Sequence, residues 1–460
     1  MSPTIQTHVL MVSLFYQGHI NPMLRFAKVL NSKGVHVTIA TTEHASDQMQ
    51  NGSWQRDDLL DFGYFADGLE LGLDRDKNLD ILLEEYLPRD GAKNISNLID
   101  FIENKGKKLS CIIGNCFVPW VASVAKAHNI PCGMLWVQSC ATYTISYNYF
   151  KNPSNFPSLS DPNNMVKIDG LPLLRVCDLP TYVLPSTPPH FRNVVATTIN
   201  TLDQFDWIFG SSFNEIEEIF INFMANHKPI SLIGPLVPPT MFEEQNHIQD
   251  NNDICINWLN KQKPSSIIYI ALGSISVLSQ GETDVIASIL EDDNKLHFLW
   301  VRKEGEKGWG RKMGDLPKGF LDKTKDRGLI VSWCCQEKVL MHPSIQCFLT
   351  HCGWNSTLEA ITGGVPVIAY PDWTDQVTNA KLLVDVFNVG VRMRKSDNGG
   401  ELSKDEVKRC ISEVTQGPNA MAMKNQAIKW KEGAKNATLP NGSSSKIIND
   451  FICEIKGEVA

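Results

Sequence analysis

The sequence has no apolar run long enough to cross a membrane and no excess of positive charge. A membrane-spanning helix needs about 20 consecutive apolar residues, and no segment of the 460 residues approaches that length. The formal net charge is −8, from 43 Lys and Arg against 51 Asp and Glu. A net-acidic chain is a poor partner for nucleic acid or an anionic membrane surface. We therefore expect no nucleic acid binding and no stable membrane insertion, and any anionic ligand must be bound by local dipoles.

The twelve cysteines form no Cys-x-x-Cys pair, and many of them lie inside apolar, strand-like runs. Cysteines in such surroundings are typical of small, reduced core residues. The first residues, MSPTIQTHVLMVSL, contain neither a basic leader nor a cleavage site. Both features predict a cytoplasmic protein whose thiols stay reduced.

The first strand is predicted at residues 8–14, a continuous apolar run of the kind buried on both faces of a parallel sheet. A helix from about residue 20 to 31 and a second strand at 35–41 follow it. Two strands joined by a crossover helix are the unit of an α/β domain. The loop after the first strand is not GxGxxG, so the fingerprint of dinucleotide-binding proteins is absent there.

The length of the chain exceeds that of one ordinary core, which predicts two domains. Both halves repeat the same strand and helix rhythm, and between them the segment GPLVPPTMFEEQNHIQDNND combines prolines with a polar run. We expect two Rossmann-like, doubly wound parallel sheets that face a cleft. The predicted domains are 1–238 and 254–440, with a linker at 239–253 and a final helix at about 441–460 that packs back on the first domain. Eight prolines within 151–192 predict a long, partly ordered loop there.

The most informative stretch is 333–376, WCCQEKVLMHPSIQCFLTHCGWNSTLEAITGGVPVIAYPDWTDQ. Its pattern predicts a strand, a glycine-containing turn, a helix and a second strand. In the turn HCGWNST, Asn355 or Ser356 can cap the helix, and backbone N–H groups at a helix start bind phosphate. An Asn-Ser-Thr helix start taken alone is more often an ordinary cap.

The whole stretch resembles, nearly position for position, the plant secondary-product glycosyltransferase signature, which is the donor-binding box of UDP-sugar-dependent family 1 enzymes. The resemblance implies a GT-B fold and inverting, metal-independent transfer of a sugar from a UDP-sugar. In that family Trp333 would stack on uracil, the backbone of Cys334 would bind its edge, and Gln336 and Glu359 would bind the ribose.

The same resemblance implies which residues hold the rest of the donor. The diphosphate would be bound by His351, Asn355, Ser356, the backbone of Gly353, and Ser274 in the LGS turn. This set can stabilise the charge on the leaving UDP without a metal. Trp354, Asp375 and Gln376 would bind sugar hydroxyls. Gln at the last position is the usual ending for glucose, so UDP-glucose is the expected co-substrate, and no cofactor or metal is expected.

His19 follows the first predicted strand, where an open α/β sheet places its ligands. A lone histidine in a loop is usually structural, but GHINP resembles the catalytic-histidine motif of the same family, in which this residue is the general base. The family's Asp partner is replaced by Asn115. An amide cannot stabilise an imidazolium as a carboxylate would. A phenol (pKa about 10) needs a strong base, whereas a carboxylic acid (about 4) arrives ionised, so Asn115 favours an acid as acceptor. An equal alternative is that Asn115 only caps the following helix.

Four segments of the chain resemble the branch of the family that makes glucose esters of phenolic and indolic carboxylic acids: LWVQSCA at 135–141, the LPLL…DLP…LPS pattern at 171–186, WCCQEKVL, and DQVTNAKLLVDVFNVGVR at 375–392. This branch also contains enzymes that glucosylate phenolic hydroxyls, and related enzymes form C-glucosides. Phe117, Gln138 and the loop 151–192 are the candidates for an apolar acceptor site. The predicted reaction is therefore glucose transfer to a small aromatic acid, with O- and C-glucosylation as alternatives.

Two possible metal sites receive simpler explanations. Asp74-Arg75-Asp76 is a DxD triplet, as in metal-dependent glycosyltransferases, but it follows a polar loop and fits a solvated charge cluster. His342 and His351, with Cys347 between them and Cys352 after His351, match no closed tetrahedral zinc spacing. A non-catalytic UDP-sugar-binding protein and an epimerase on a related fold remain alternatives for the function. We expect the protein to be a monomer.

Overall fold

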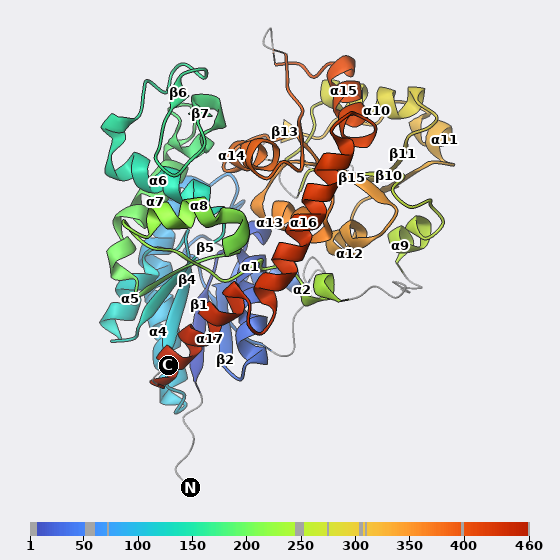
Figure 1. Cartoon of the computed structure of the whole chain (residues 1–460). Coiled ribbons are helices and arrows are strands. Elements are labelled where there is room, and N and C mark those ends of the chain that lie inside the picture. The colour runs from blue at the N-terminus through green and yellow to red at the C-terminus, as the bar shows by residue number, and fades with distance from the viewer. Residues whose placement is uncertain are drawn as a thin grey trace. The chain divides into compact units, whose positions relative to one another are not determined.

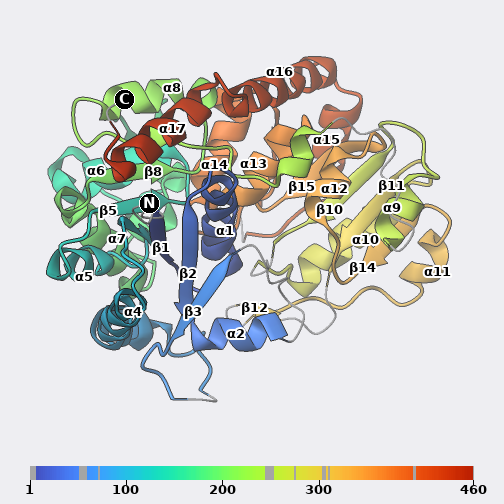
Figure 2. The same cartoon turned by 90° about the horizontal axis from the view of Figure 1, so that it is seen from below.

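The computed structural model describes residues 7–50, 60–70, 73–243, 253–273, 276–302, 307–308, 311–396 and 400–458 (Figure 1, and Figure 2 from below). The chain forms two compact units, one of Met1–Leu236 with Asn436–Ala460 and the other of Val237–Lys435. The predicted linker 239–253 begins with a short 3-10 helix, η6 (Pro239–Phe242), which contacts helices of the second unit. Residues 244–252 of that linker lie outside the described part of the chain.

The first unit is built on a seven-stranded parallel sheet with the order β3-β2-β1-β4-β5-β8-β9. Its strands are β1 (His8–Val12), β2 (His36–Thr42), β3 (Asp61–Phe65), β4 (Cys111–Asn115), β5 (Cys132–Trp136), β8 (Trp207–Gly210) and β9 (Ser231–Leu232). The central strands β1, β4 and β5 are buried along their whole length because both faces of the sheet are covered. The chain winds outward from β1 in one direction and from β4 in the other, so the switch point lies between these two strands.

The helices of the first unit cover both faces of this sheet (Figures 1 and 2). They are α1 (Gln17–Ser32), α2 (Glu43–Gln50), α3 (Leu79–Ile81), the π-helix η1 (Leu82–Gly91), α4 (Ala92–Asn104), α5 (Val121–Ala127), α6 (Cys140–Lys151), α7 (Pro189–Asn200), α8 (Asn214–Met224) and α17 (Ser443–Lys456). The C-terminal helix α17 contacts β9, and its Phe451 ring packs on Phe209 with the ring centroids 4.9 Å apart.

The proline-rich segment 151–192 is more ordered than the sequence predicted. It holds η2 (Pro153–Asn155), β6 (Met165–Val166), β7 (Leu174–Arg175), η3 (Val176–Asp178), η4 (Thr181–Val183) and the start of α7. Strands β6 and β7 pair antiparallel. Proline is compatible with such short elements because it tolerates turns and the first helical position.

The second unit is built on a six-stranded parallel sheet with the order β14-β11-β10-β15-β16-β17. Its strands are β10 (Ile267–Ala271), β11 (His297–Val301), β14 (Gly328–Val331), β15 (Ile345–Thr350), β16 (Val367–Ala369) and β17 (Gly390–Arg392). Strands β12 (Lys307–Gly308) and β13 (Arg311–Lys312) form a separate antiparallel pair. Here the switch point lies between β10 and β15.

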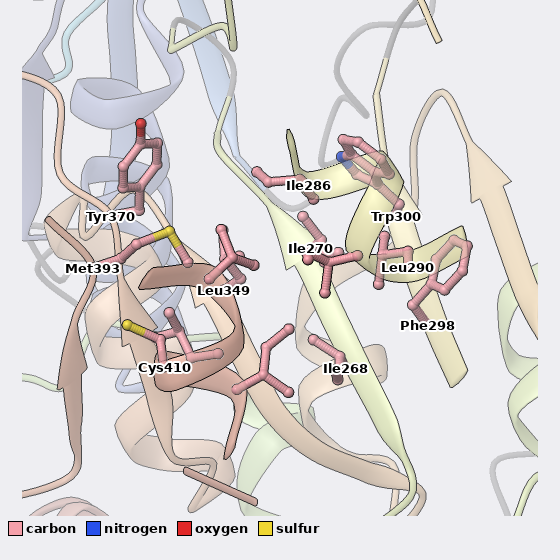
Figure 3. Packing of buried hydrophobic residues seen from close by; sticks show 14 of the residues in the cluster. Ile268, Ile270, Ile286, Leu290, Phe298, Trp300, Leu349, Tyr370, Met393 and Cys410 are labelled. Carbon is pink, nitrogen blue, oxygen red and sulfur yellow. The ribbon is translucent and has the colours of Figure 1, made fainter. Parts of the chain in front are cut away.

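The helices of the second unit are α9 (Ile254–Leu259), α10 (Gln280–Asp292), α11 (Phe320–Thr324), α12 (Gln336–Met341), α13 (Trp354–Gly363), α14 (Gln376–Lys381), the π-helix η7 (Leu382–Val386), α15 (Lys404–Thr415) and most of α16 (Ala420–Thr438). On one face of the sheet, Ile268 and Ile270 of β10 pack with Ile286 and Leu290 of α10 in a buried apolar cluster (Figure 3). Each unit thus has its own core around a doubly wound parallel sheet, as predicted.

Among the described residues, no helix combines the length and the apolar character that a membrane-crossing segment requires.

Candidate functional site

His19 lies in the first turn of α1, directly after β1, and its side chain meets Asn115 at the end of β4. The Nδ1 atom of His19 is 3.0 Å from Oδ1 of Asn115. Strands β1 and β4 are the neighbours that flank the switch point of the first sheet. The two residues that the sequence placed 96 positions apart are therefore brought together where an α/β sheet binds its ligands.

The hydrogen bonds of Asn115 fix the tautomer of His19. Oδ1 of Asn115 also accepts from the backbone N–H of Phe117 at 3.0 Å, and that N–H can only donate. The oxygen must therefore point in this direction, and His19 must donate from Nδ1. Its Nε2 atom is left with a lone pair that can accept a proton.

Asn115 closes a local turn in addition to contacting His19. Its bond to Phe117 spans two residues, as in an Asx turn, whereas the N-cap position of α5 is occupied by Trp120. The alternative that Asn115 only caps the following helix is therefore wrong.

The environment of His19 keeps its imidazole neutral. Burial lowers the pKa of His19 to about 4, and the hydrogen bond to Asn115 opposes this shift only weakly. The ring of Phe117 packs edge-on against the imidazole, with the centroids 4.5 Å apart. A neutral, half-buried imidazole beside an amide is a weak base, since no neighbouring negative charge stabilises its protonated form.

Gln138 lies at the same edge of the first sheet, two residues beyond β5. Asn115 of β4 is paired with Leu135 of β5, so the segment that follows β5 leaves the sheet next to the His19–Asn115 pair. The Gln138 side chain is 9% exposed, and its Oε1 accepts from the hydroxyl of Tyr182 at 3.2 Å. His19, Phe117 and Gln138 thus follow the carboxyl ends of β1, β4 and β5, respectively.

A cavity of about 390 Å³ lies within the proline-rich segment. Its lining consists of Leu159, Ser160, Pro162, Val176, Cys177, Leu184, Pro185 and Ser186. It includes none of His19, Phe117 or Gln138, and it offers no carboxylate, histidine or lysine.

In the second unit, the turn between β15 and α13 presents a helix start without a side-chain cap. Gly353 occupies the N-cap position, where it makes no side-chain hydrogen bond, and Asn355 and Ser356 fall in the first turn of α13. The expectation that Asn355 or Ser356 caps this helix is therefore wrong, because the helix begins at Trp354 and its N-cap position is Gly353. The uncapped first turn suits an anionic group such as a diphosphate.

His351 is packed between two glycines at this helix start. A Cβ atom on Gly273 or Gly353 would lie 2.6 or 2.5 Å from the imidazole, respectively. Burial lowers the pKa of His351 to about 4, opposed by the charge of Asp372. Nδ1 of His351 is buried and has no hydrogen-bond partner among the described residues. Ser274, next to Gly273, lies outside the described residues, and its predicted role stays a prediction.

The predicted ribose-binding residues contact one another. Nε2 of Gln336, at the start of α12, donates to Glu359 Oε2 at 2.7 Å and to Ser356 Oγ at 2.8 Å. The hydroxyl of Tyr269 in β10 donates to Gln336 Oε1 at 3.1 Å. Tyr269 also lies 3.3 Å from the sulfur of Cys334. The sequence analysis missed Tyr269, whose signal is a hydroxyl in an otherwise apolar strand.

The Trp333 indole is 69% exposed, whereas Cys334 beside it is buried. An exposed aromatic ring next to the ribose-binding pair is a free surface for stacking. The neighbouring Cys334 leaves its backbone as the part that a base edge could bind.

At the end of the box, hydrogen bonds fix the orientation of both predicted sugar-binding residues. Oε1 of Gln376 accepts from the backbone N–H of Asp372 at 2.9 Å and of Trp373 at 3.2 Å, so its NH₂ group is the part left for a ligand. Asp375 Oδ2 accepts from Nδ2 of Asn379 at 2.7 Å, and burial raises the pKa of Asp375. Asn379 was also missed by the sequence analysis.

Trp354, the third predicted sugar-binding residue, is buried at the start of α13. Its Nε1 has no hydrogen-bond partner in the described part of the chain. An unpaired indole N–H is a donor that a sugar hydroxyl could satisfy.

The DxD triplet closes a turn in the first unit. Oδ1 of Asp74 accepts from the backbone N–H groups of Asp76 and Lys77, and Oδ1 of Asp76 accepts from the Tyr16 hydroxyl at 2.9 Å. Arg75 is 8% exposed and pairs with the buried Asp67, so the expectation of a fully solvated cluster was wrong for this residue. Within the described ranges, no group of three or more His, Cys, Asp or Glu side chains could hold a metal ion.

Comparison with known proteins identifies relatives over nearly the whole chain. The family model "UDP-glucoronosyl and UDP-glucosyl transferase" matches residues 216–429. UDP-glycosyltransferase 84B2 of Arabidopsis thaliana is 41% identical, over 97% of this chain and 99% of that protein. Gallate 1-beta-glucosyltransferase 84A24 of Punica granatum is 40% identical over 98% of this chain and 89% of that protein, and the cinnamate beta-D-glucosyltransferase of Fragaria ananassa is 38% identical over 98% and 82%.

A solved structure supports the same assignment. Os79 of O. sativa, in complex with U2F and trichothecene, is 28% identical and superimposes with a TM-score of 0.83, over 97% of this chain and 100% of that one.

Proposed function

The chain belongs to the plant UDP-glycosyltransferases and has their GT-B fold, and we propose that within this family it transfers glucose from UDP-glucose to a small aromatic carboxylic acid. The transfer inverts the anomeric carbon, needs no metal, and yields a glucose ester. Membership of an enzyme family displaces the alternative of a non-catalytic binding protein. A cytoplasmic location and a monomeric state remain predictions.

The observation that carries the choice of acceptor is the pairing of His19 with an amide. The pKa of His19 is about 4, and that of an unperturbed phenol is about 10. Full proton transfer from such a phenol to His19 is therefore uphill by about 6 pKa units, or about 8 kcal/mol. An aromatic carboxylic acid arrives ionised and needs no base. This choice agrees with the similarity of the chain to the gallate and cinnamate glucosyltransferases, with which it shares about 40% sequence identity.

In the proposed reaction a carboxylate oxygen of the acceptor attacks C1 of glucose. The new C1–O bond forms as the bond from C1 to the diphosphate oxygen breaks, and UDP carries away the electron pair. The first turn of α13 and the unpaired Nδ1 of His351 stabilise the charge on the departing diphosphate. The first unit contributes an apolar wall at Phe117 and the amide of Gln138 to orient the acceptor.

Glucose is proposed as the transferred sugar because the last two residues of the stretch 333–376 offer complementary groups. Gln376 presents an NH₂ donor, and Asp375 presents carboxylate oxygens held by Asn379. A donor and an acceptor side by side can bind a pair of neighbouring sugar hydroxyls.

A second candidate is O-glucosylation of a phenolic hydroxyl. It is favoured by one observation, that Nε2 of His19 carries the lone pair and is thus the correct tautomer to accept a hydroxyl proton. C-glucosylation of a polyphenol would use the same base.

The three products are separated by incubating the protein with UDP-glucose and a panel of aromatic acids, phenols and polyphenols, followed by mild alkali. An ester is cleaved by alkali, an O-glucoside resists it, and a C-glucoside also resists acid. Alkali-labile products from the acids are expected. If the acids give no such product while the phenols are glucosylated, the ester-forming proposal is wrong.

A further inference from the structure

Tyr182, in the proline-rich segment, connects that segment to the acceptor edge of the first sheet through a buried polar chain. The tyrosine is 1% exposed. Its hydroxyl donates to Oε1 of Gln138 at 3.2 Å and lies 3.1 Å from Oγ of Ser146 on α6. Oγ of Ser146 donates its own proton to the carbonyl of Thr142 at 2.7 Å, so the one proton of the Tyr182 hydroxyl is shared between Oε1 of Gln138 and Oγ of Ser146.

The backbone that carries Gln138 is held independently of Tyr182. Nε1 of Trp136 donates to the carbonyl of Ser139 at 3.1 Å, and Oγ of Ser139 caps α6 by accepting from the N–H of Thr142 at 3.2 Å. Oε1 of the buried Glu217 accepts from the N–H of Ala141 at 3.3 Å. These hydrogen bonds therefore hold the backbone on both sides of Gln138 in place. The side-chain amide of Gln138 can still rotate.

We propose that Tyr182 is a positioning residue that sets the preference of the enzyme for carboxylate over phenol acceptors, by fixing which end of the Gln138 amide faces the acceptor. With Oε1 occupied by Tyr182, the NH₂ group is presented. An NH₂ group donates well to a carboxylate, which can only accept, whereas an amide oxygen in its place would repel it. A phenol hydroxyl can donate or accept, so it tolerates either orientation. This inference rests on the proposed function.

The test compares Tyr182→Phe with a matched control, Tyr143→Phe. Tyr143 is also a buried tyrosine of the first unit, on α6, and its hydroxyl donates to the carbonyl of Lys228 at 3.2 Å instead of to Gln138. Both changes keep the ring and remove one hydroxyl. In Tyr182→Phe, the ratio of kcat/KM for an aromatic acid to kcat/KM for a phenol should fall by about tenfold, since a hydrogen bond to a charged group is lost or misdirected. The fall should come mainly from a higher KM for the acid.

In Tyr143→Phe the ratio should stay within about twofold of the wild type, a change that lies inside the usual range for a remote site. The KM for UDP-glucose should be unchanged in both variants. An equal fall in the two variants, or a change confined to the KM for UDP-glucose, would overturn the inference.

A double-mutant cycle with Gln138→Leu provides the second test. Gln138→Leu alone should lower the same ratio by at least as much as Tyr182→Phe. Adding Tyr182→Phe to Gln138→Leu should change the ratio no further, because Tyr182 acts through the amide that is already gone. A further fall of similar size in the double variant contradicts the inference, and Gln138→Leu still tests it if Tyr182→Phe fails to fold.

The outcomes separate this inference from the proposed function. A wild-type protein that glucosylates phenols and never an acid overturns both. A wild-type protein that makes glucose esters, with a ratio insensitive to Gln138→Leu and Tyr182→Phe, overturns only the role of Tyr182.

Discussion

The two sheets carry their candidate residues at the same topological position, beside the switch point, yet each unit assembles its residues differently. In the second unit nearly all of them come from one continuous stretch, 333–376. In the first unit they come from four separate segments, with His19 after β1, Asn115 and Phe117 around the end of β4, Gln138 after β5, and Tyr182 in η4. A donor site of this kind is contained in one sequence motif. The four segments of the first unit, by contrast, can each change in sequence independently of the others.

The half-buried histidines His19 and His351 repeat the contrast. Burial lowers the pKa of both His19 and His351 to about 4, so both are neutral at pH 7. His19 has a fixed partner in Asn115 and a defined tautomer, as a proton acceptor requires. Nδ1 of His351 has no partner in the described ranges, as suits a group that awaits a ligand. The hydrogen bonds of the two histidines, and not their pKa values, therefore distinguish the two roles that we propose for them.

The largest effect is expected when His19 of the first unit is replaced. His19→Ala should lower kcat for a phenol by about 10²- to 10⁴-fold, the range for loss of a general base, and should lower transfer to an aromatic acid by about tenfold or less. The affinity for UDP, measured by calorimetry, should not change. The control is His128→Ala, also in the first unit, where the histidine contacts Ser96 and no candidate residue. An unchanged rate for phenols in His19→Ala would contradict its role as base.

The next largest effect is expected from a substitution in the second unit, Gly353→Ala. In Gly353→Ala the new Cβ would lie 2.5 Å from the His351 imidazole, which must then move away from the helix start. The Kd for UDP should rise by about tenfold or more, a loss of at least about 1.4 kcal/mol, with the acid-to-phenol ratio unchanged.

The matched control for Gly353→Ala is Gly281→Ala on α10, where a Cβ meets nothing within 4 Å. It should leave the Kd for UDP unchanged. Equal losses in the two variants would show that His351 does not need its close glycine neighbour.

The smallest expected effect is the pH response of the acid acceptor. The folded-state pKa of His19 is lowered to about 4, so the imidazole stays neutral from pH 8 down to about pH 5. An aromatic acid with a pKa near 4 stays ionised over the same range. The kcat/KM for an acid should therefore change by less than about threefold between pH 8 and 5.5, and that for a phenol should be equally flat, because the imidazole that accepts its proton is neutral throughout this range. A break near pH 6.5 with the acid would mean that His19 titrates as an exposed histidine.

Much of the fold followed from hydrophobic periodicity. The strands predicted at 8–14 and 35–41 are observed as His8–Val12 and His36–Thr42, and the helix predicted from about 20 to 31 is observed as Gln17–Ser32, because each is a strongly patterned segment. The helix Pro189–Asn200 was missed. A proline at its first position is a helix-start signal, but the neighbouring prolines predicted a loop. The π-helix Leu82–Gly91 contains Pro88, and no local rule predicts such a helix.

The candidate sites show the same limit. The donor residues could be named because their motif is contiguous, and the His19 and Asn115 positions because each follows a recognisable strand. Tyr269, Asn379 and Tyr182 could not be named, because each acts through a contact made by tertiary packing, such as the bond between Tyr182 and Gln138 across 44 positions. Hydrogen-bond partners of this kind become visible only when the strands are placed side by side.

The most direct test of the account is Asn115→Asp. A carboxylate beside Nδ1 would raise the pKa of His19 and stabilise the imidazolium, so the acid-to-phenol ratio of kcat/KM should fall by about tenfold or more through faster transfer to phenols. The alkali-labile product from aromatic acids should persist in the variant. An unchanged ratio, or a variant that turns over phenols no faster than the wild type, would contradict the claim that the His19–Asn115 pair selects carboxylic acids as acceptors.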